Sequence, residues 1–157
     1  MHVSKRKSPR APIAAKAQVA CGLERYEATV SQISEGGFRL DSDKDLPKAR
    51  LVVSFELPGH GPQRVLGEVC WQRQLPRAKG TGCMFRELPP ATQATITNYV
   101  KRMKQACTEL QFALAMNKPR AVWNSLAREV GVGHLMDRQD IKIFLGHAME
   151  QLQSGGR

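Results

Sequence analysis

Residues 31–37 read Ser31-Gln32-Ile33-Ser34-Glu35-Gly36-Gly37 and decide how the chain around them folds. An apolar run rich in β-branched residues ends within this stretch, and apolar alternation resumes directly after it, at Phe38. Two adjacent glycines permit a positive φ or a close backbone approach that a side chain would forbid. We therefore expect a tight turn between two strands, with the Ser34 hydroxyl and the glycine N–H groups facing a ligand.

A basic segment, Lys5-Arg6-Lys7-Ser8-Pro9-Arg10, precedes this turn by some twenty residues. Residues 1–11 contain almost no apolar side chains, which predicts a flexible arm. The guanidinium groups of Arg6 and Arg10 can each match phosphate oxygens or the O6/N7 edge of guanine. Arm and turn together therefore predict a site for a ligand that is anionic and contains a purine.

Short segments that alternate apolar and polar residues follow one another through the middle of the chain. The clearest is Arg50–Leu57, and Arg64–Gln74 alternates again, with Val69 and Trp71 expected on one face and Gly67 at a bend. Such strands at this spacing favour an antiparallel barrel over a sandwich. The expected strands cover residues 13–21, 26–33, 38–40, 50–57, 64–74 and 80–86.

These features resemble the PilZ domain family over residues 5–104. The arm matches the family signature RxxxR, and Gln32–Gly37 matches the signature [D/N]xSxxG at every place except the first. PilZ domains are small bacterial β-barrels, and many bind cyclic di-GMP through these two motifs. The resemblance therefore implies a six-stranded antiparallel PilZ-type β-barrel over residues 12–90, after the arm (1–11) and before a helical region (91–157).

The resemblance also implies a role for each residue of the two motifs. The arm would bind phosphate and guanine, and the turn would donate and accept hydrogen bonds with a guanine from the opposite side. In this family the ligand is often an intercalated dimer of cyclic di-GMP. The implied ligand-binding residues are Arg6, Lys7, Arg10, Gln32, Ser34, Gly36 and Gly37. Gln32 replaces the usual Asp or Asn, so it keeps an acceptor oxygen but lacks the negative charge of Asp. We expect this change to weaken binding by about 1–2 kcal/mol.

The C-terminal region has the apolar periodicity of about three helices, over residues 91–116, 120–130 and 137–152, the last capped by Asp137. The stripe from Ile96 to Leu114 can pack on the barrel, on the other helices, or on a second copy to make a homodimer. Residues 125–132 also resemble the start of a helix-turn-helix. The acidic Asp137 and Asp140 that follow oppose contact with DNA.

Composition narrows the function class further. The formal net charge of the chain is +10, and nearly all of it lies in the N-terminal and C-terminal segments. Residues 26–90 are almost neutral. No apolar run is long enough to span a membrane and no signal peptide is visible, so we expect a cytoplasmic protein without membrane insertion. The four cysteines and four histidines lack metal-ligand spacing, so we assign no metal and expect buried, reduced thiols.

The sequence shows no pattern typical of a catalytic nucleophile with its base, and no phosphate-binding loop. This argues against an enzyme. The favoured function is a cyclic di-GMP receptor that relays binding to the helical region by ordering of the arm, and so acts on a protein partner. The alternative is an adaptor in motility or pilus control that no longer binds nucleotide. A DNA-binding regulator ranks below both.

Overall fold

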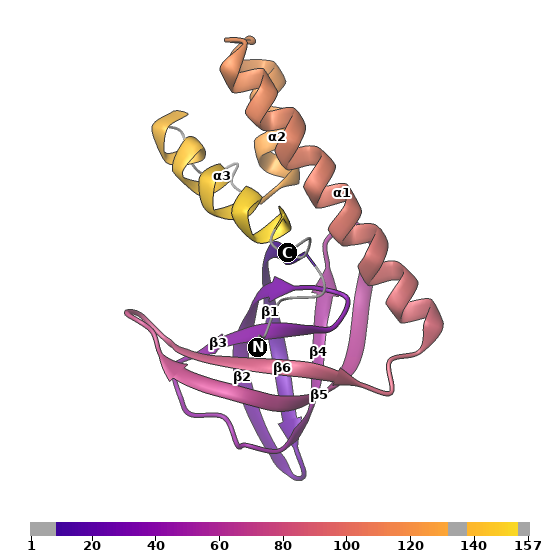
Figure 1. Ribbon diagram of the computed structural model, residues 1–157. Coiled ribbons are helices and arrows are strands. Elements are labelled where there is room, and N and C mark those ends of the chain that lie inside the picture. The colour runs from indigo at the N-terminus through magenta and orange to yellow at the C-terminus, as the bar shows by residue number, and fades with distance from the viewer. Residues whose placement is uncertain (1–8, 132–137, 154–157) are drawn as a thin grey trace, which may run out of the picture. The chain divides into compact units, whose positions relative to one another are not determined.

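Six antiparallel strands form a closed barrel in a computed structural model that describes residues 9–131 and 138–153 (Figure 1). The order around the barrel is β1-β2-β3-β6-β5-β4, so β3 and β6, like β1 and β4, pair across a long stretch of sequence. This confirms the expected barrel. The strands are β1 Ala11–Cys21, β2 Glu24–Ile33, β3 Gly37–Ser42, β4 Arg50–Leu57, β5 Gly61–Gln74 and β6 Lys79–Arg86.

The barrel core is built from alternate residues of each strand. Along β4, every second residue is buried and the residues between face outward. Because side chains of a strand alternate between its faces, this period of two places one apolar row inside the barrel. The largest fully buried apolar side chains of the barrel are Val19, Val30, Ile33, Leu40, Leu51, Val53 and Leu57.

Two β-bulges interrupt this alternation, one between Val30 and Gln32 and one between Val69 and Trp71. A bulge adds one residue to a strand and so changes the face on which later residues lie. Val69 pairs with buried Cys83, but Trp71 pairs with Gly82 in the outer register. The expectation that Val69 and Trp71 share a face was therefore wrong.

Gly67 was expected at a bend of the strand, but its role in the structure is to make room for a neighbouring side chain. A Cβ atom at Gly67 would lie 2.7 Å from Cζ of Phe38, so glycine leaves room for that ring inside the barrel. Phe38 also packs against Phe85, with ring centroids 5.1 Å apart.

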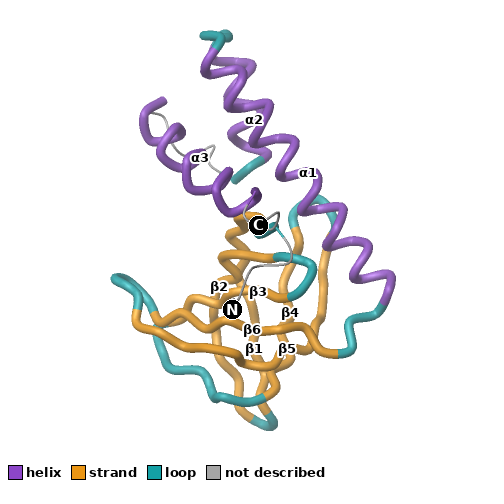
Figure 2. The backbone as a smooth tube through the Cα atoms, viewed as in Figure 1, coloured by secondary structure: helices purple, strands orange, loops and turns teal. Residues whose placement is uncertain are grey.

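Three helices follow the barrel strands: α1 Pro90–Ala115, α2 Arg120–Glu129 and α3 Arg138–Gln153 (Figure 2). This agrees with the three expected helices, although Asp137 lies outside the described residues. The chain divides within α1 into two units, residues 13–97 and residues 98–157 with 1–12. Among the described residues, no helix is both long and apolar enough to cross a membrane.

The apolar stripe of α1 is buried within the chain, from Ile96 through Leu110 to Leu114. A homodimer formed through this stripe would therefore require the stripe to become exposed first. In the helical unit, Arg102 of α1 forms an ion pair with Glu129 of α2, and Arg138 of α3 donates a 2.8 Å hydrogen bond to the carbonyl of Leu114.

The four cysteines differ in burial, contrary to the expectation that all are buried. Cys83 and Cys107 are buried, Cys21 is half-buried and Cys70, at a bulge, is exposed. Burial raises the pKa of the Cys83 thiol to about 12 and that of Cys107 to about 11. These two thiols are therefore protonated at neutral pH.

Alkylation should separate the cysteines into two classes. Iodoacetamide at pH 8 should label Cys70 first and leave Cys83 and Cys107 unmodified, because only an accessible thiolate reacts. Mass spectrometry of digested protein would measure each site, and labelling in urea would show that all four thiols can react. Labelling of Cys83 as fast as Cys70 in the folded protein would contradict the observed core.

Candidate functional site

The turn at residues 34–37 is organised by Ser34. The Ser34 Oγ accepts hydrogen bonds from the N–H groups of Gly36 and Gly37, each at 3.2 Å, and donates to the Gly37 carbonyl at 3.3 Å. The Ser34 N–H donates to the same carbonyl at 2.8 Å. These groups were expected to be free, but they are hydrogen-bonded to one another within the turn. Their contact with a ligand stays a prediction.

Glycine occurs at positions 36 and 37 in different structural settings. A Cβ atom at Gly37 would lie 2.1 Å from the carbonyl oxygen of Cys83, because β3 and β6 pair closely here. Gly36 has nothing within 4 Å of such an atom, and its carbonyl accepts a 3.0 Å bond from the Phe85 N–H. Neither has a positive φ. Close approach at Gly37 is therefore the constraint that requires glycine.

The basic arm is described only in part. Arg6 and Lys7 lie outside the described residues, so the structure does not place them. The N–H of Arg10 donates a 3.1 Å hydrogen bond to the carbonyl of Gln151, near the end of α3. In the same unit, the Tyr99 hydroxyl donates to the carbonyl of Pro12 at 2.9 Å. The end of the arm is thus bonded to helical residues far away in sequence.

Gln32 lies in a row of four residues that crosses the outer face of the barrel. The strand registers pair Gln32 with Arg39, Arg39 with Gly82, and Gly82 with Trp71. We call Gln32, Arg39, Gly82 and Trp71 the outer row. The neighbouring pairs Ile33–Phe38 and Cys83–Val69 face the interior, so the outer row faces away from the core.

Arg39 is held in place by its neighbours on the same face. Its Nε donates to Ser31 Oγ at 2.8 Å and to Asp41 Oδ1 at 3.0 Å, and its Nη2 donates to Asp41 Oδ2 at 3.3 Å. Ser31 is the extra residue of the β2 bulge, so the bulge turns its hydroxyl toward Arg39. The charge of Arg39 is thereby largely matched by Asp41.

Sequence reasoning missed Arg39, Gly82 and Trp71 as neighbours of Gln32. Arg39 reaches Gln32 through the pairing of β2 with β3. Gly82 and Trp71 reach the same face through the pairings of β3 with β6 and of β6 with β5. The available signal was the Gly80-Thr81-Gly82 pattern next to an alternating strand that contains Trp71. Glycine in a strand often marks close approach of another group.

A metal centre is not supported by the described part of the chain. Among residues 9–131 and 138–153, no group of three or more His, Cys, Asp or Glu side chains gathers closely enough to hold an ion. The chemistry available on the outer face is hydrogen bonding, stacking and cationic charge.

Comparison with known proteins identifies the barrel. The family model for the PilZ domain matches residues 4–102. Among curated proteins, no match is found. Solved structures that match include Escherichia coli YcgR in complex with c-di-GMP, at 12% identity and a TM-score of 0.63, covering 71% of this chain and 51% of that one.

Two further matches extend this group. The Bacillus subtilis inhibitor of motility MotI/DgrA has 16% identity and a TM-score of 0.56, with 64% and 51% of the two chains covered. MrkH of K. pneumonia, a c-di-GMP-dependent transcription regulatory factor, has 17% identity and a TM-score of 0.53, with 64% and 51% covered. The chain thus spans about half the length of these proteins. At these identities the likeness concerns the fold.

Substitution of the two turn glycines should give unequal results. Gly37→Ala should lower the free energy of unfolding by about 2 kcal/mol, because the new methyl group meets the Cys83 carbonyl. Gly36→Ala should change it by less than about 0.5 kcal/mol, since its site is open. Urea denaturation of both variants would measure the difference. Equal stability of the two would mean that β3 and β6 do not pair closely at Gly37.

Proposed function

Because the chain belongs to the PilZ domain family, we propose that it is a receptor for cyclic di-GMP. The observation that carries this proposal is the occurrence of both binding signatures, Arg6–Arg10 and Gln32–Gly37, in one chain with the barrel fold. The presence of c-di-GMP in the matching YcgR structure supports the same assignment.

In this proposal, Arg6 and Arg10 bind phosphate and the O6/N7 edge of guanine, and Lys7 adds positive charge. Arginine suits both tasks because its planar guanidinium can form two parallel hydrogen bonds and can also stack on a base. The ligand is cyclic di-GMP, as one molecule or as an intercalated dimer. No metal takes part.

The turn contributes through its shape. Because Ser34 Oγ bonds to the N–H groups of Gly36 and Gly37, its first role is to hold the backbone in one conformation. A fixed turn offers the ligand a preformed contact surface, which lowers the entropy cost of binding. Gln32 then supplies an amide oxygen to the guanine N–H groups, without the charge of the Asp found in many family members.

We propose that binding is relayed to the helices through the arm. The arm residue Arg10 is hydrogen-bonded through its N–H to Gln151 of α3, and Pro12 through its carbonyl to Tyr99 of α1. A ligand that repositions the arm would strain or strengthen these bonds, and thus favour one arrangement of the helical unit. The helical unit would then act on a protein partner in the cytoplasm.

An adaptor that does not bind nucleotide is the second candidate. Gln32 favours it, because this change removes the charge-assisted bond to guanine that the family motif provides. The matching inhibitor of motility from Bacillus subtilis suggests motility control as one setting. A DNA-binding regulator ranks third, suggested by the transcription regulatory factor MrkH.

Isothermal titration with cyclic di-GMP distinguishes these candidates. The wild type should bind, Arg10→Ala should bind at least ten-fold more weakly because a charged hydrogen bond is lost, and Gln32→Asp should bind about ten-fold more tightly. Arg64→Ala, which removes the same charge from another part of the barrel surface, should leave the affinity unchanged. A wild type that releases no heat and shows no binding in equilibrium dialysis would select the adaptor.

A further inference from the structure

Glu35 connects the turn at residues 34–37 to helix α1. The Thr97 hydroxyl donates a 3.0 Å hydrogen bond to Oε1 of Glu35, across 62 positions of sequence, and both residues are half-buried. Both belong to the unit of residues 13–97, so this contact lies within one unit. Since Glu35 stands between Ser34 and Gly36, a residue of α1 bonds to a side chain of the turn signature itself.

A second bond ties the same turn to the start of α1 by way of β6. The Phe85 N–H donates to the Gly36 carbonyl at 3.0 Å, and Phe85 is next to the last residue of β6. Only residues 87–89 separate β6 from α1, which begins at Pro90. Pro89 and Pro90 restrict this link because each proline fixes its own φ. The first turns of α1 are therefore anchored to the turn both through the chain and through a side-chain bond.

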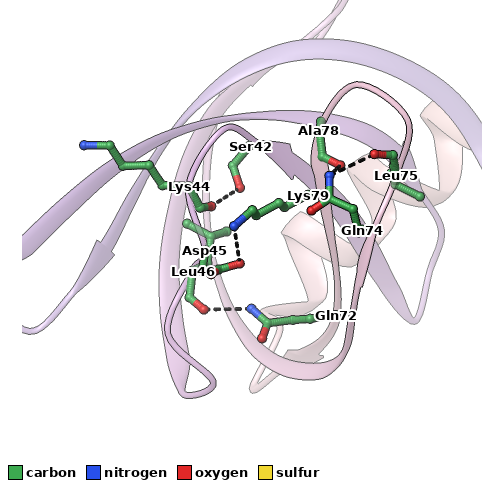
Figure 3. A network of polar contacts seen from close by, with 9 residues as sticks. All are labelled: Ser42, Lys44, Asp45, Leu46, Gln72, Gln74, Leu75, Ala78 and Lys79. Atoms are coloured by element: carbon green, nitrogen blue, oxygen red, sulfur yellow. Dashed lines mark hydrogen bonds and ion pairs between the residues drawn. The ribbon is translucent and has the colours of Figure 1, made fainter.

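The opposite end of the β3–β6 ladder is fixed by contacts of its own. Ser42 and Lys79 are ladder partners at this end. The Ser42 Oγ donates to the Lys44 carbonyl at 2.7 Å, and Lys79 pairs with Asp45 at 3.1 Å (Figure 3). We therefore expect the ladder to stay in place when the turn moves, so that α1 receives the change.

The negative charge of Glu35 gives this contact a consequence for a ligand. Cyclic di-GMP carries two phosphates, and like charges repel, so a carboxylate that turns toward the ligand would weaken binding. The hydrogen bond from Thr97 holds this carboxylate to α1 instead. The state in which Glu35 is bonded to Thr97 is therefore the state that suits an anionic ligand.

We infer that Thr97 is a positioning residue of the nucleotide site, which holds the Glu35 carboxylate to α1 and so couples ligand binding to the position of this helix. This inference rests on the proposed function and adds a route to α1 that does not use the arm. Because coupling is reciprocal, a ligand that favours the bonded state of Glu35 also strengthens the tie between the turn and α1. α1 continues as one helix to Ala115, so a change at Thr97 reaches residues of the helical unit.

The first test is titration of cyclic di-GMP into Thr97→Val, which keeps the β-branched shape and removes the hydroxyl. At low salt it should bind about five-fold more weakly than the wild type, and at about 1 M salt the difference should nearly disappear, since the Debye length is then about 3 Å. Thr97→Ser keeps the hydroxyl and should bind as the wild type does. Thr95→Val is the matched control, because the Thr95 hydroxyl donates to the Ala91 carbonyl of the same helix, and its affinity should be unchanged.

Glu35→Gln separates the effect of charge from that of shape. This variant should bind at least as tightly as the wild type, because it removes a carboxylate from the turn. Thr97→Val added to Glu35→Gln should then have no further effect on affinity, and the double-mutant cycle measures the coupling between the two residues. A purely structural defect at Thr97 would instead weaken binding in both backgrounds and at both salt concentrations.

Hydrogen exchange tests the link to α1. Saturating cyclic di-GMP should slow the exchange of α1 amides at residues 97–104 in the wild type and in Thr95→Val, and should slow it less in Thr97→Val. Mass spectrometry of peptides from this part of α1 measures the effect, with each variant at the same ligand saturation.

The outcomes separate the two proposals. No binding by the wild type would overturn both. Wild-type affinity in Thr97→Val, or a loss in Thr97→Val that persists in the Glu35→Gln background, would overturn this inference and leave the receptor proposal standing. A salt-dependent loss that disappears in the Glu35→Gln background, together with weaker protection of α1 in Thr97→Val, would support the positioning role of Thr97.

Discussion

The pairing of β3 with β6 is the constraint on which the rest of the barrel depends. The first residues of these strands, Gly37 and Lys79, are 42 positions apart in the sequence. They pair with Met84 and Ser42 at the two ends of the ladder. The ladder brings the Gly37 backbone so close to the Cys83 carbonyl that no side chain fits. It also places the turn at Ser34 and the outward-facing residues of β5 and β6 on one surface.

Two bulges give this surface its chemistry. Without the extra residue in β2, Ser31 would not reach Arg39, and without the extra residue in β5, Trp71 would continue on the face of Val69. Bulges leave an unpaired residue in the ladder, which costs stability, and they are often found beside functional sites because they redirect side chains. Both bulges of this barrel adjoin the outer row, one beside Gln32 and the other beside Trp71.

Ser34 shows how a signature residue can act without an exposed donor. Its hydroxyl is hydrogen-bonded within the turn, so what it fixes is the geometry of residues 34–37.

The local pattern of the sequence was enough to determine the strands, the helices and the two signatures. Alternation along Arg50–Leu57 reproduced β4, and the apolar stripe from Ile96 to Leu114 reproduced the buried face of α1, because periodicity is a local property. The side on which Trp71 lies and the exposure of Cys70 were decided only by the tertiary structure. Each depends on which strand lies beside another and in what register, and a one-residue bulge reverses the face of every residue after it.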